Sequence, residues 1–232
     1  MRIFGKGFNY SQDGPGNRLV YHLSGCNMRC RWCSNPEGMT KTIGKAYTVD
    51  EIVRECESSR PLFFGGGVTF TGGEATLQAD ELQQVLELLR ERGIHTALET
   101  NGTAENLPDI AANVDYLIMD FKHHDAEMLR RYAGVGNEMV KRNFAHFCCA
   151  GRQLHVRIPL INSFNADDPT AFATYFAQHN TTQVVFEFLP YHEYGKDKWQ
   201  TSYEVTDGFV SPQTVDMFRK TFTAYGLTLI TT

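Results

Sequence analysis

The chain has 232 residues and a formal net charge of −5, and it is 42% hydrophobic and 21% charged. This length is enough for one domain with a sizeable core, and we expect a single domain over residues 1–232. The acidic balance, without any block of Lys or Arg, disfavours nucleic acid as a main partner. No signal-peptide core opens the chain and no apolar run approaches a membrane span, so we expect a cytoplasmic protein.

Apolar runs alternate with amphipathic segments along the chain. The expected strands are residues 19–23, 68–71, 95–99, 116–120, 154–160 and 183–189, with a short segment at 227–230. The expected helices are residues 48–58, 80–92, 107–113, 126–132, 138–150, 168–179 and 211–225. This alternation predicts a parallel sheet with right-handed crossovers. Six units are too few for an eightfold barrel, so the predicted fold is α/β, an open partial (β/α)6 barrel.

Three cysteines follow the first of these strands with the spacing C-x3-C-x2-C. They are Cys26, Cys30 and Cys33. Thiolates this close usually share one metal centre, and a cubane iron–sulfur cluster held by protein alone takes four cysteines, so three would leave one iron open. A zinc site with His22 as fourth ligand is the alternative. A disulfide framework is disfavoured, because the six cysteines are irregularly spaced.

Polar residues recur at the expected carboxyl ends of the strands, where parallel α/β folds place functional groups. Gly73 would let a ligand approach bare backbone, although a plain turn is the alternative. Lys122 can present an ammonium to a carboxylate, or it is a solvated surface lysine. Arg157 lies in an apolar strand and must be paired if buried, which favours a ligand-facing role.

Histidines are harder to assign from the sequence. His192 follows the sixth expected strand and can pack on or bond a heterocycle, although lone histidines are usually structural. His123, His124 and Asp125 have no third ligand nearby in sequence, so we interpret them as a solvated loop.

Together, these features resemble radical S-adenosylmethionine enzymes, and more closely the activating enzymes of glycyl radical enzymes. The motifs of the resemblance are the cysteine loop with Trp32 before its last cysteine, Asp13-Gly14-Pro15-Gly16-Asn17-Arg18, Gly65-Gly66-Gly67-Val68-Thr69, Thr71-Gly72-Gly73-Glu74, Glu99-Thr100-Asn101-Gly102, Met119-Asp120-Phe121-Lys122 and Leu189-Pro190-Tyr191-His192-Glu193-Tyr194-Gly195-Lys196. The resemblance is closest to the pyruvate formate-lyase type, and its motifs run in order from about residue 3 to residue 199.

The resemblance implies the cofactors and the residues around them. Cys26, Cys30 and Cys33 would hold a [4Fe-4S] cluster whose open iron is chelated by S-adenosylmethionine. The implied cofactor-binding residues are Trp32, Cys33, Ser34, Gly73, Glu99, Asp120, Phe121, Lys122, Arg157 and His192. Among them, Lys122 and Arg157 would hold the carboxylate of the cofactor. Together with the three cysteines, these two residues are the implied catalytic residues.

Three of the other implied contacts are more specific. Gly73 would offer backbone to the methionine amino group, and His192 would contact the adenine or ribose. Glu99 and Asp120 would mark a site for a monovalent cation, with Glu99 where the family pattern has Asp.

The implied activity is that of an oxidoreductase of anaerobic metabolism. A flavodoxin or ferredoxin would reduce the cluster, and the 5′-deoxyadenosyl radical made from S-adenosylmethionine would take a hydrogen from a glycine of a partner glycyl radical enzyme. Residues 13–18 would help to dock this partner, and we expect a monomer. Between Cys33 and Gly72 the only cysteine is Cys56, so no ferredoxin-like insert with its own cluster is expected.

Two alternatives remain open at this point. One is a radical S-adenosylmethionine enzyme acting on a small molecule, and the other is a non-enzymatic iron–sulfur or zinc module.

Overall fold

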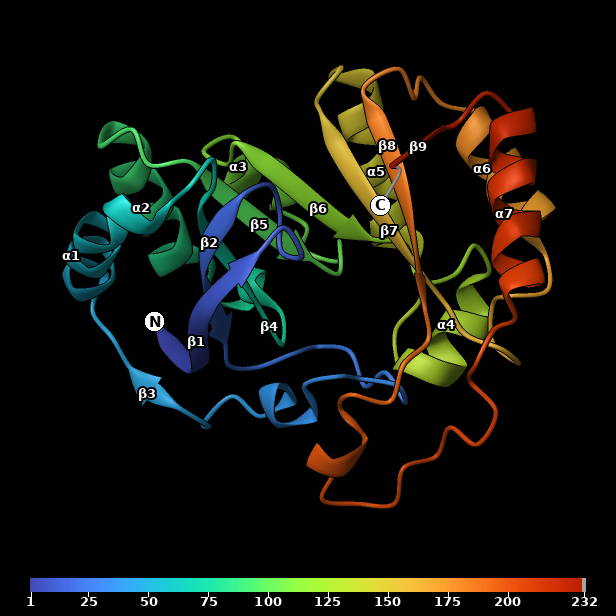
Figure 1. The fold of residues 1–232 in the computed structure, drawn as a ribbon, viewed down its shortest axis with the longest axis horizontal. Helices are drawn as coiled ribbons and strands as arrows, with labels where there is room; N and C mark the ends of the chain where they lie inside the picture. Colours follow the sequence, from blue (N-terminus) through green and yellow to red (C-terminus); the bar gives the residue numbers. More distant parts are fainter. Residues whose placement is uncertain (231–232) are drawn as a thin grey trace. The chain divides into compact units, whose positions relative to one another are not determined.

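The computed structural model describes residues 1–230 and shows the predicted alternation of strands and helices (Figure 1). The strands are β1 (Arg2–Tyr10), β2 (Asn17–Leu23), β3 (Lys45–Ala46), β4 (Gly67–Gly72), β5 (Thr96–Thr100), β6 (Tyr116–Asp120), β7 (Leu154–Leu160), β8 (Val184–Pro190) and β9 (Thr228–Leu229). The helices are α1 (Val49–Ser59), α2 (Ala79–Glu91), α3 (Leu107–Ala111), α4 (Ala126–Ala133), α5 (Glu138–Cys149), α6 (Pro169–Ala177) and α7 (Pro212–Ala224).

The sheet is mainly parallel. Its strand order is β3-β1-β2-β4-β5-β6-β7-β8-β9. The pairs β2–β4, β4–β5, β7–β8 and β8–β9 are parallel, whereas β1 pairs antiparallel with β2 and β3. The six main predicted strands correspond to β2, β4, β5, β6, β7 and β8, so the predicted α/β class with a mainly parallel sheet is confirmed.

The first hairpin was not predicted. Strand β1 contains Gly5, Lys6 and Gly7, the last two of which are exposed, so it lacks the apolar alternation that marks a strand. The strand expected over residues 19–23 begins two residues earlier, because Asn17 and Arg18 already belong to β2. Fully buried Arg18 continues the strand because its guanidinium donates to Thr69 Oγ1 and the Val68 carbonyl, both at 2.6 Å.

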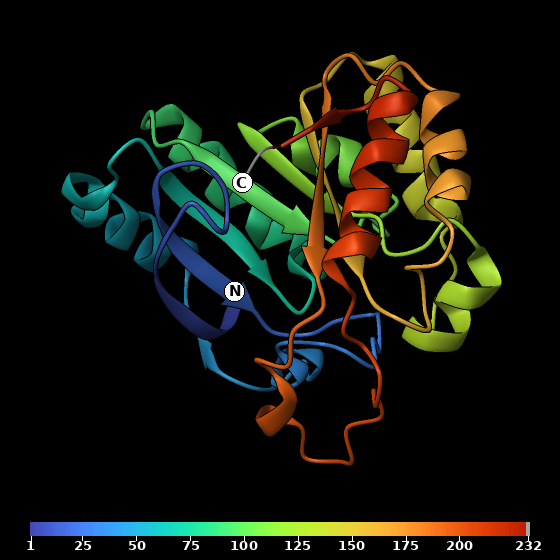
Figure 2. The ribbon, with the colours of Figure 1, turned by 45° about the vertical axis from the view of Figure 1, so that its right-hand side comes forward.

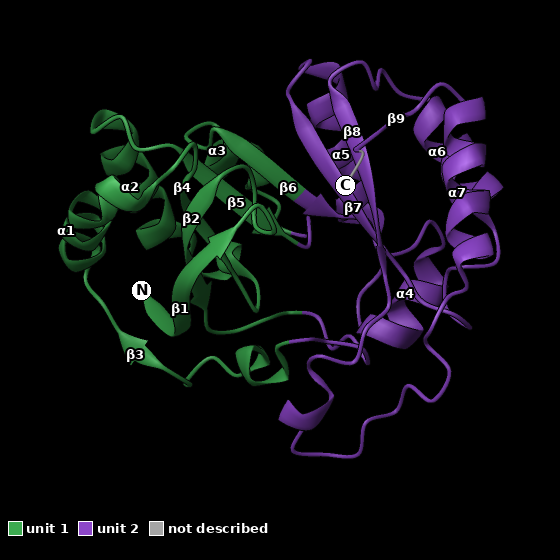
Figure 3. Ribbon diagram, viewed as in Figure 1, with its two compact units in different colours: residues 1–27, 35–100, 104–118 green, residues 28–34, 101–103, 119–232 purple. Residues whose placement is uncertain are grey.

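Backbone contacts divide the chain into two compact units (Figure 3). Unit 1 comprises residues 1–27, 35–100 and 104–118, and unit 2 comprises residues 28–34, 101–103 and 119 onward. The chain crosses between the units several times, and the single-domain expectation stays a prediction. Within residues 1–230, no helix combines the length and the apolar character that a bilayer span needs.

The core of unit 1 follows the predicted helical pattern. Helix α2 buries the one face formed by Leu82, Val85, Leu86 and Leu89. Helix α1 begins with a capping box, in which Thr48 and Glu51 exchange hydrogen bonds. These two helices contact each other, and α2 also contacts β5.

Unit 2 is held by a cluster of aromatic side chains. Phe121, at the end of β6, packs against Phe176 of α6 with ring centroids 4.7 Å apart. Helices α6 and α7 lie side by side, orange and red in Figure 2, and Phe172 contacts Phe218 between them. Because Phe121 is fully buried in this cluster, the flanking Asp120 and Lys122 are fixed at the end of β6.

Candidate functional site

The loop after β2 carries the three cysteines. Cys30 is buried, Cys26 and Cys33 are half-buried, and within residues 1–230 none of the six cysteines forms a disulfide. Around Cys30 the chain runs along the end of α4, where the N–H groups of Arg29 and Arg31 donate to the carbonyls of Ala133 (2.7 Å) and Tyr132 (3.3 Å). These bonds use helix-end carbonyls that have no partner within the helix.

A second segment, residues 193–204, holds the third cysteine. The Trp199 indole Nε1–H donates to the Cys33 carbonyl at 3.1 Å, and the Lys198 ammonium donates to the Ser34 carbonyl at 3.0 Å. A Cβ on Gly195 would lie 2.4 Å from the Ser34 Cα, so this position requires glycine. The predicted cofactor neighbour Trp32 packs on Phe164 with ring centroids 4.4 Å apart.

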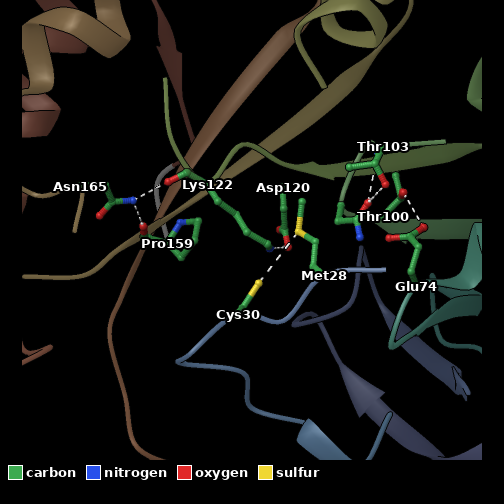
Figure 4. Close-up of polar contacts among 10 residues, drawn as sticks. Met28, Cys30, Glu74, Thr100, Thr103, Asp120, Lys122, Pro159 and Asn165 are labelled. Atoms are coloured by element: carbon green, nitrogen blue, oxygen red, sulfur yellow. Dashed lines mark hydrogen bonds and ion pairs between the residues drawn. The ribbon is translucent and has the colours of Figure 1, made fainter. Parts of the chain in front are cut away.

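The donor set of the loop fits an iron–sulfur cluster by its chemistry. Three free thiols within eight residues are soft ligands suited to iron–sulfur clusters. Among residues 1–230 no three His, Cys, Asp or Glu side chains form a preassembled metal site, and Cys30 Sγ lies 3.9 Å from Met28 Sδ (Figure 4). His22, the fourth ligand in the zinc alternative, packs on the Phe4 ring at 5.7 Å.

In unit 1, the end of β4 is a point where three backbone segments meet. The Gly73 N–H donates to the Leu23 carbonyl at 2.9 Å, and a Cβ on Gly73 would lie 2.2 Å from the Gly25 oxygen and 2.3 Å from the Gly38 oxygen. Glycine is therefore required here by packing. Its contact with a cofactor stays a prediction.

Glu74 is a site residue that the sequence interpretation did not single out. Its side chain is buried, and its carboxylate accepts hydrogen bonds from the hydroxyls of Thr76 (2.6 Å) and Thr100 (2.7 Å; Figure 4). The second bond ties the end of β4 to the end of β5, beside half-buried Glu99. The sequence could have marked Glu74, because a charged residue stands there directly after two glycines at the end of a strand.

In unit 2, Asp120 and Lys122 form an ion pair at the end of β6 (Figure 4). Only 11% of the Lys122 side chain is exposed, so the alternative of a solvated surface lysine is wrong. Phe121, predicted to contact the cofactor, has its side chain in the aromatic core, and its N–H donates to the Arg157 carbonyl at 2.8 Å. A cofactor contact of Phe121 is therefore limited to its carbonyl oxygen.

Arg157 on β7 is half-buried and paired within the chain, and its ligand-facing role stays a prediction. Its Nε donates to Glu187 Oε2 on β8 at 2.8 Å, and His155 Nε2 lies 3.0 Å from the same oxygen. Burial opposes the charged form of Glu187, but the bonds from His155 and Arg157 outweigh it and lower the pKa of this carboxyl. The Glu187 carboxylate therefore stays charged and orients the guanidinium. Sequence analysis predicted the arginine and missed its partner.

The histidines differ in environment. His192 is half-buried and stacks on Tyr194 with ring centroids 4.2 Å apart, and its burial lowers its pKa, which favours the neutral ring. The interpretation of His123 as part of a solvated loop is wrong. His123 is 5% exposed, with Nε2 2.9 Å from the Phe164 carbonyl and Nδ1 accepting from the Asp125 N–H.

Asn165 links the ends of two strands in unit 2 and was also missed. Its amide Nδ2 donates to the carbonyls of Lys122 (2.7 Å) and Pro159 (2.5 Å; Figure 4). Its Oδ1 accepts from the Ile161 N–H at 2.8 Å. The side chain is 1% exposed, so these are buried bonds. Asn165 thereby fixes the backbone that carries Lys122.

Replacing Asn165 with leucine is expected to destabilise the fold by about 2–3 kcal/mol, because buried carbonyls lose their donor. The backbone of Lys122 would then be less constrained, and we expect the KM for S-adenosylmethionine to rise about 10-fold. Urea denaturation and steady-state kinetics measure the two effects. Asn162→Leu is the control, since the exposed Asn162 side chain donates to the carboxylate of exposed Asp207. Equal effects of the two variants would contradict this role of Asn165.

Comparison with known proteins defines the class. Residues 20–176 match the model of the Radical SAM superfamily, and the chain belongs to this superfamily. The radical S-adenosylmethionine family predicted from the motifs is thus confirmed, and with it an enzyme whose family uses a [4Fe-4S] cluster and S-adenosylmethionine.

Individual relatives narrow the class. The pyruvate formate-lyase-activating enzyme of Clostridium pasteurianum is 34% identical over 198 residues, which cover 81% of each chain. The 4-hydroxyphenylacetate decarboxylase activating enzyme of Clostridioides difficile (strain 630) is 28% identical over 265 residues, 84% of each chain. Among solved structures, a domain of pyruvate-formate lyase-activating enzyme from Bacteroides vulgatus ATCC 8482 superposes with a TM-score of 0.60 at 29% identity, covering 72% of this chain and 98% of that one.

Proposed function

We propose that this protein activates a glycyl radical enzyme, pyruvate formate-lyase or a relative of it, by removing a hydrogen atom from one of its glycines. The observation that carries the proposal is the 34% identity to a pyruvate formate-lyase-activating enzyme over 81% of both chains. A second relative, 28% identical, is by its name the activating enzyme of 4-hydroxyphenylacetate decarboxylase. Cys26, Cys30 and Cys33 hold the cluster in this proposal, and their free thiols support it.

The remaining site residues bind and orient the cofactor. When bound, the cluster and S-adenosylmethionine together supply the 5′-deoxyadenosyl radical that attacks carbon–hydrogen bonds. Lys122 and Arg157 hold the carboxylate of the cofactor, each kept in place by a neighbouring acid, Asp120 and Glu187 respectively. The carbonyl of Gly73 receives the amino group, since its N–H already bonds Leu23.

Further residues contact the outer parts of the cofactor. His192, favoured as a neutral ring, contacts the adenine or ribose. Trp32 and Ser34 flank the cluster. Glu99 and Asp120 bind a monovalent cation near the cofactor.

Chain length supports the pyruvate formate-lyase type. The aligned span of 265 residues with the 4-hydroxyphenylacetate decarboxylase activating enzyme exceeds the 232 residues of this whole chain, so that relative holds residues that this chain lacks. The span of 198 residues with the pyruvate formate-lyase-activating enzyme shows no such excess. This chain, which we expect to lack a ferredoxin-like insert, is therefore closer in aligned length to the pyruvate formate-lyase-activating enzyme.

The working conditions belong to the same proposal. A flavodoxin or ferredoxin supplies the electron, and the protein acts as a monomer in the cytoplasm of an anaerobic cell. Its six free cysteines suit a reducing compartment.

The test is to reconstitute the protein with iron and sulfide under anaerobic conditions, reduce it, and add S-adenosylmethionine with pyruvate formate-lyase. We expect 5′-deoxyadenosine by chromatography and a glycyl radical signal by electron paramagnetic resonance. 5′-Deoxyadenosine without a glycyl radical on any candidate partner would favour the alternative of a small-molecule substrate. Neither product would leave only a non-enzymatic iron–sulfur or zinc module.

A further inference from the structure

The backbone of Cys33 is held on both sides by hydrogen bonds. Its N–H donates to the Cys30 carbonyl at 3.1 Å, which closes a turn between two of the three thiols. Its own carbonyl accepts from the Trp199 indole N–H, also at 3.1 Å. Within the described chain, residues 24–35 form neither helix nor strand. Contacts of this kind, rather than regular secondary structure, therefore hold the third thiol in place.

Trp199 is placed for this contact by its own surroundings. It follows the short 3-10 turn Lys196–Lys198, and its ring packs edge-on against Tyr203 with ring centroids 5.7 Å apart. The Tyr203 hydroxyl lies 2.7 Å from the hydroxyl of buried Tyr191, which directly follows β8. Side-chain contacts thus connect the end of β8 to Cys33 through Tyr203 and Trp199.

The same segment also holds the residue after the third cysteine. The Lys198 ammonium donates to the Ser34 carbonyl, and the backbone of Gly195 packs against the Ser34 Cα so closely that no Cβ fits between them. The segment therefore contacts two successive residues of the loop. The indole of Trp199 is the part of it that bonds a cysteine.

Burial alone does not explain a tryptophan at this position. Residues 196–198 and 200–202 are exposed and Trp199 itself is only half-buried, so the ring lies outside the core. The indole N–H is a donor without acceptor capacity, and a large ring with few torsions orders at low entropic cost. Partners that hold the ligands of a metal centre limit how far those ligands move, and losing such a partner weakens metal binding.

We propose that Trp199 is a positioning residue for the iron–sulfur cluster and slows the departure of the Cys33 thiolate by fixing the backbone that carries it. This inference rests on the proposed function, which places the cluster on Cys26, Cys30 and Cys33. A cluster held by three cysteines has one open iron without a protein ligand. Trp199 therefore protects the irons that the cysteines hold and leaves the release of the open iron unchanged.

The experiment uses two measurements on the reconstituted protein without S-adenosylmethionine. Decay of the visible absorption in excess bathophenanthroline disulfonate, an iron chelator, follows loss of the whole cluster. Electron paramagnetic resonance of the three-iron cluster formed on mild ferricyanide oxidation follows loss of the open iron. In Trp199→Phe, which keeps an aromatic ring without the N–H, we expect the first rate to rise about 10-fold and the second to change by less than about twofold.

Two further variants separate the hydrogen bond from other effects. Benzothienylalanine at position 199 keeps nearly the shape of the indole and has sulfur in place of the N–H, so it should lose the cluster as fast as Trp199→Phe. Tyr225→Phe is the matched control. It removes the hydroxyl that lies 3.3 Å from Thr174 Oγ1 on an exposed ring just after α7, and both rates should match the wild type.

Three outcomes would overturn the proposal: a Trp199→Phe variant that keeps the cluster as long as the wild type, a benzothienylalanine variant that does so, or an equal rise of both rates. The second would assign the effect to the packing of the ring, and the third to a general loosening of the fold. None of these measurements needs a partner enzyme. A wild-type protein that holds its cluster but makes no glycyl radical would therefore contradict the proposed function alone.

Discussion

Replacing Cys30 with serine is expected to abolish cluster assembly and with it glycyl radical formation. Serine keeps nearly the same shape but offers a hard oxygen in place of a soft thiolate, which iron–sulfur clusters require. Cys30 is buried in the loop, so no other donor replaces it readily. We expect iron content after reconstitution to fall by most of its value and activity to fall at least about 100-fold. Cys26→Ser and Cys33→Ser should behave in the same way.

The matched control is Cys149→Ser, because Cys149 is an exposed free cysteine near the end of α5. It should keep the iron content and activity of the wild type. Iron analysis, the visible charge-transfer absorption and the radical signal measure the effect. Full iron content in Cys30→Ser would contradict the assignment of the loop as the cluster site.

Local patterns made most of the fold predictable. The spacing of Leu82, Val85 and Leu89 identifies the buried face of α2, and Thr48 with Glu51 identifies the start of α1. Strand β1 could not be recognised in this way. Its structure depends on pairing with β2, a contact that leaves no apolar alternation in its own glycine-containing sequence.

The site was predictable only where its residues are neighbours in sequence. The cysteine spacing is local, and Lys122 follows Asp120, the last residue of β6, by only two positions. Arg157 and Glu187 are thirty positions apart and meet because the β7–β8 register places them opposite each other. Hydrophobic patterns do not specify such a register residue by residue.

Asn165 shows a further limit of sequence analysis. Its three bonds go to backbone groups, so no complementary side chain in the sequence marks it as a link between β6 and β7. The candidate site thus contains two kinds of residue: side chains with a chemical role, and buried polar residues that hold the backbone of those side chains in place. Both kinds are needed for a geometry that holds a cofactor in place.

The acidic partner of Arg157 also makes stability depend on pH. The pKa of Glu187 is lowered in the folded protein, so its contribution to stability is complete above the unfolded value of about 4.3. That contribution is lost as the pH falls below this value towards the lower folded pKa. A variant without the carboxylate should therefore differ from the wild type at pH 7 and approach it in the acid range.

Replacing Glu187 with glutamine removes a carboxylate charge that both Arg157 and His155 contact. The Arg157 and His155 side chains are 12% and 5% exposed, and breaking a buried pair from one side leaves an uncompensated charge that costs about 3–5 kcal/mol. We expect this loss in urea denaturation at pH 7, a smaller loss near pH 4, and a KM for S-adenosylmethionine raised because the guanidinium is no longer oriented. Glu57→Gln is the matched control, since Glu57 pairs with Arg92 at the surface and should change stability by less than about 1 kcal/mol. A Glu187→Gln variant as stable as Glu57→Gln at pH 7 would show that the Glu187 carboxylate does not hold Arg157 in place.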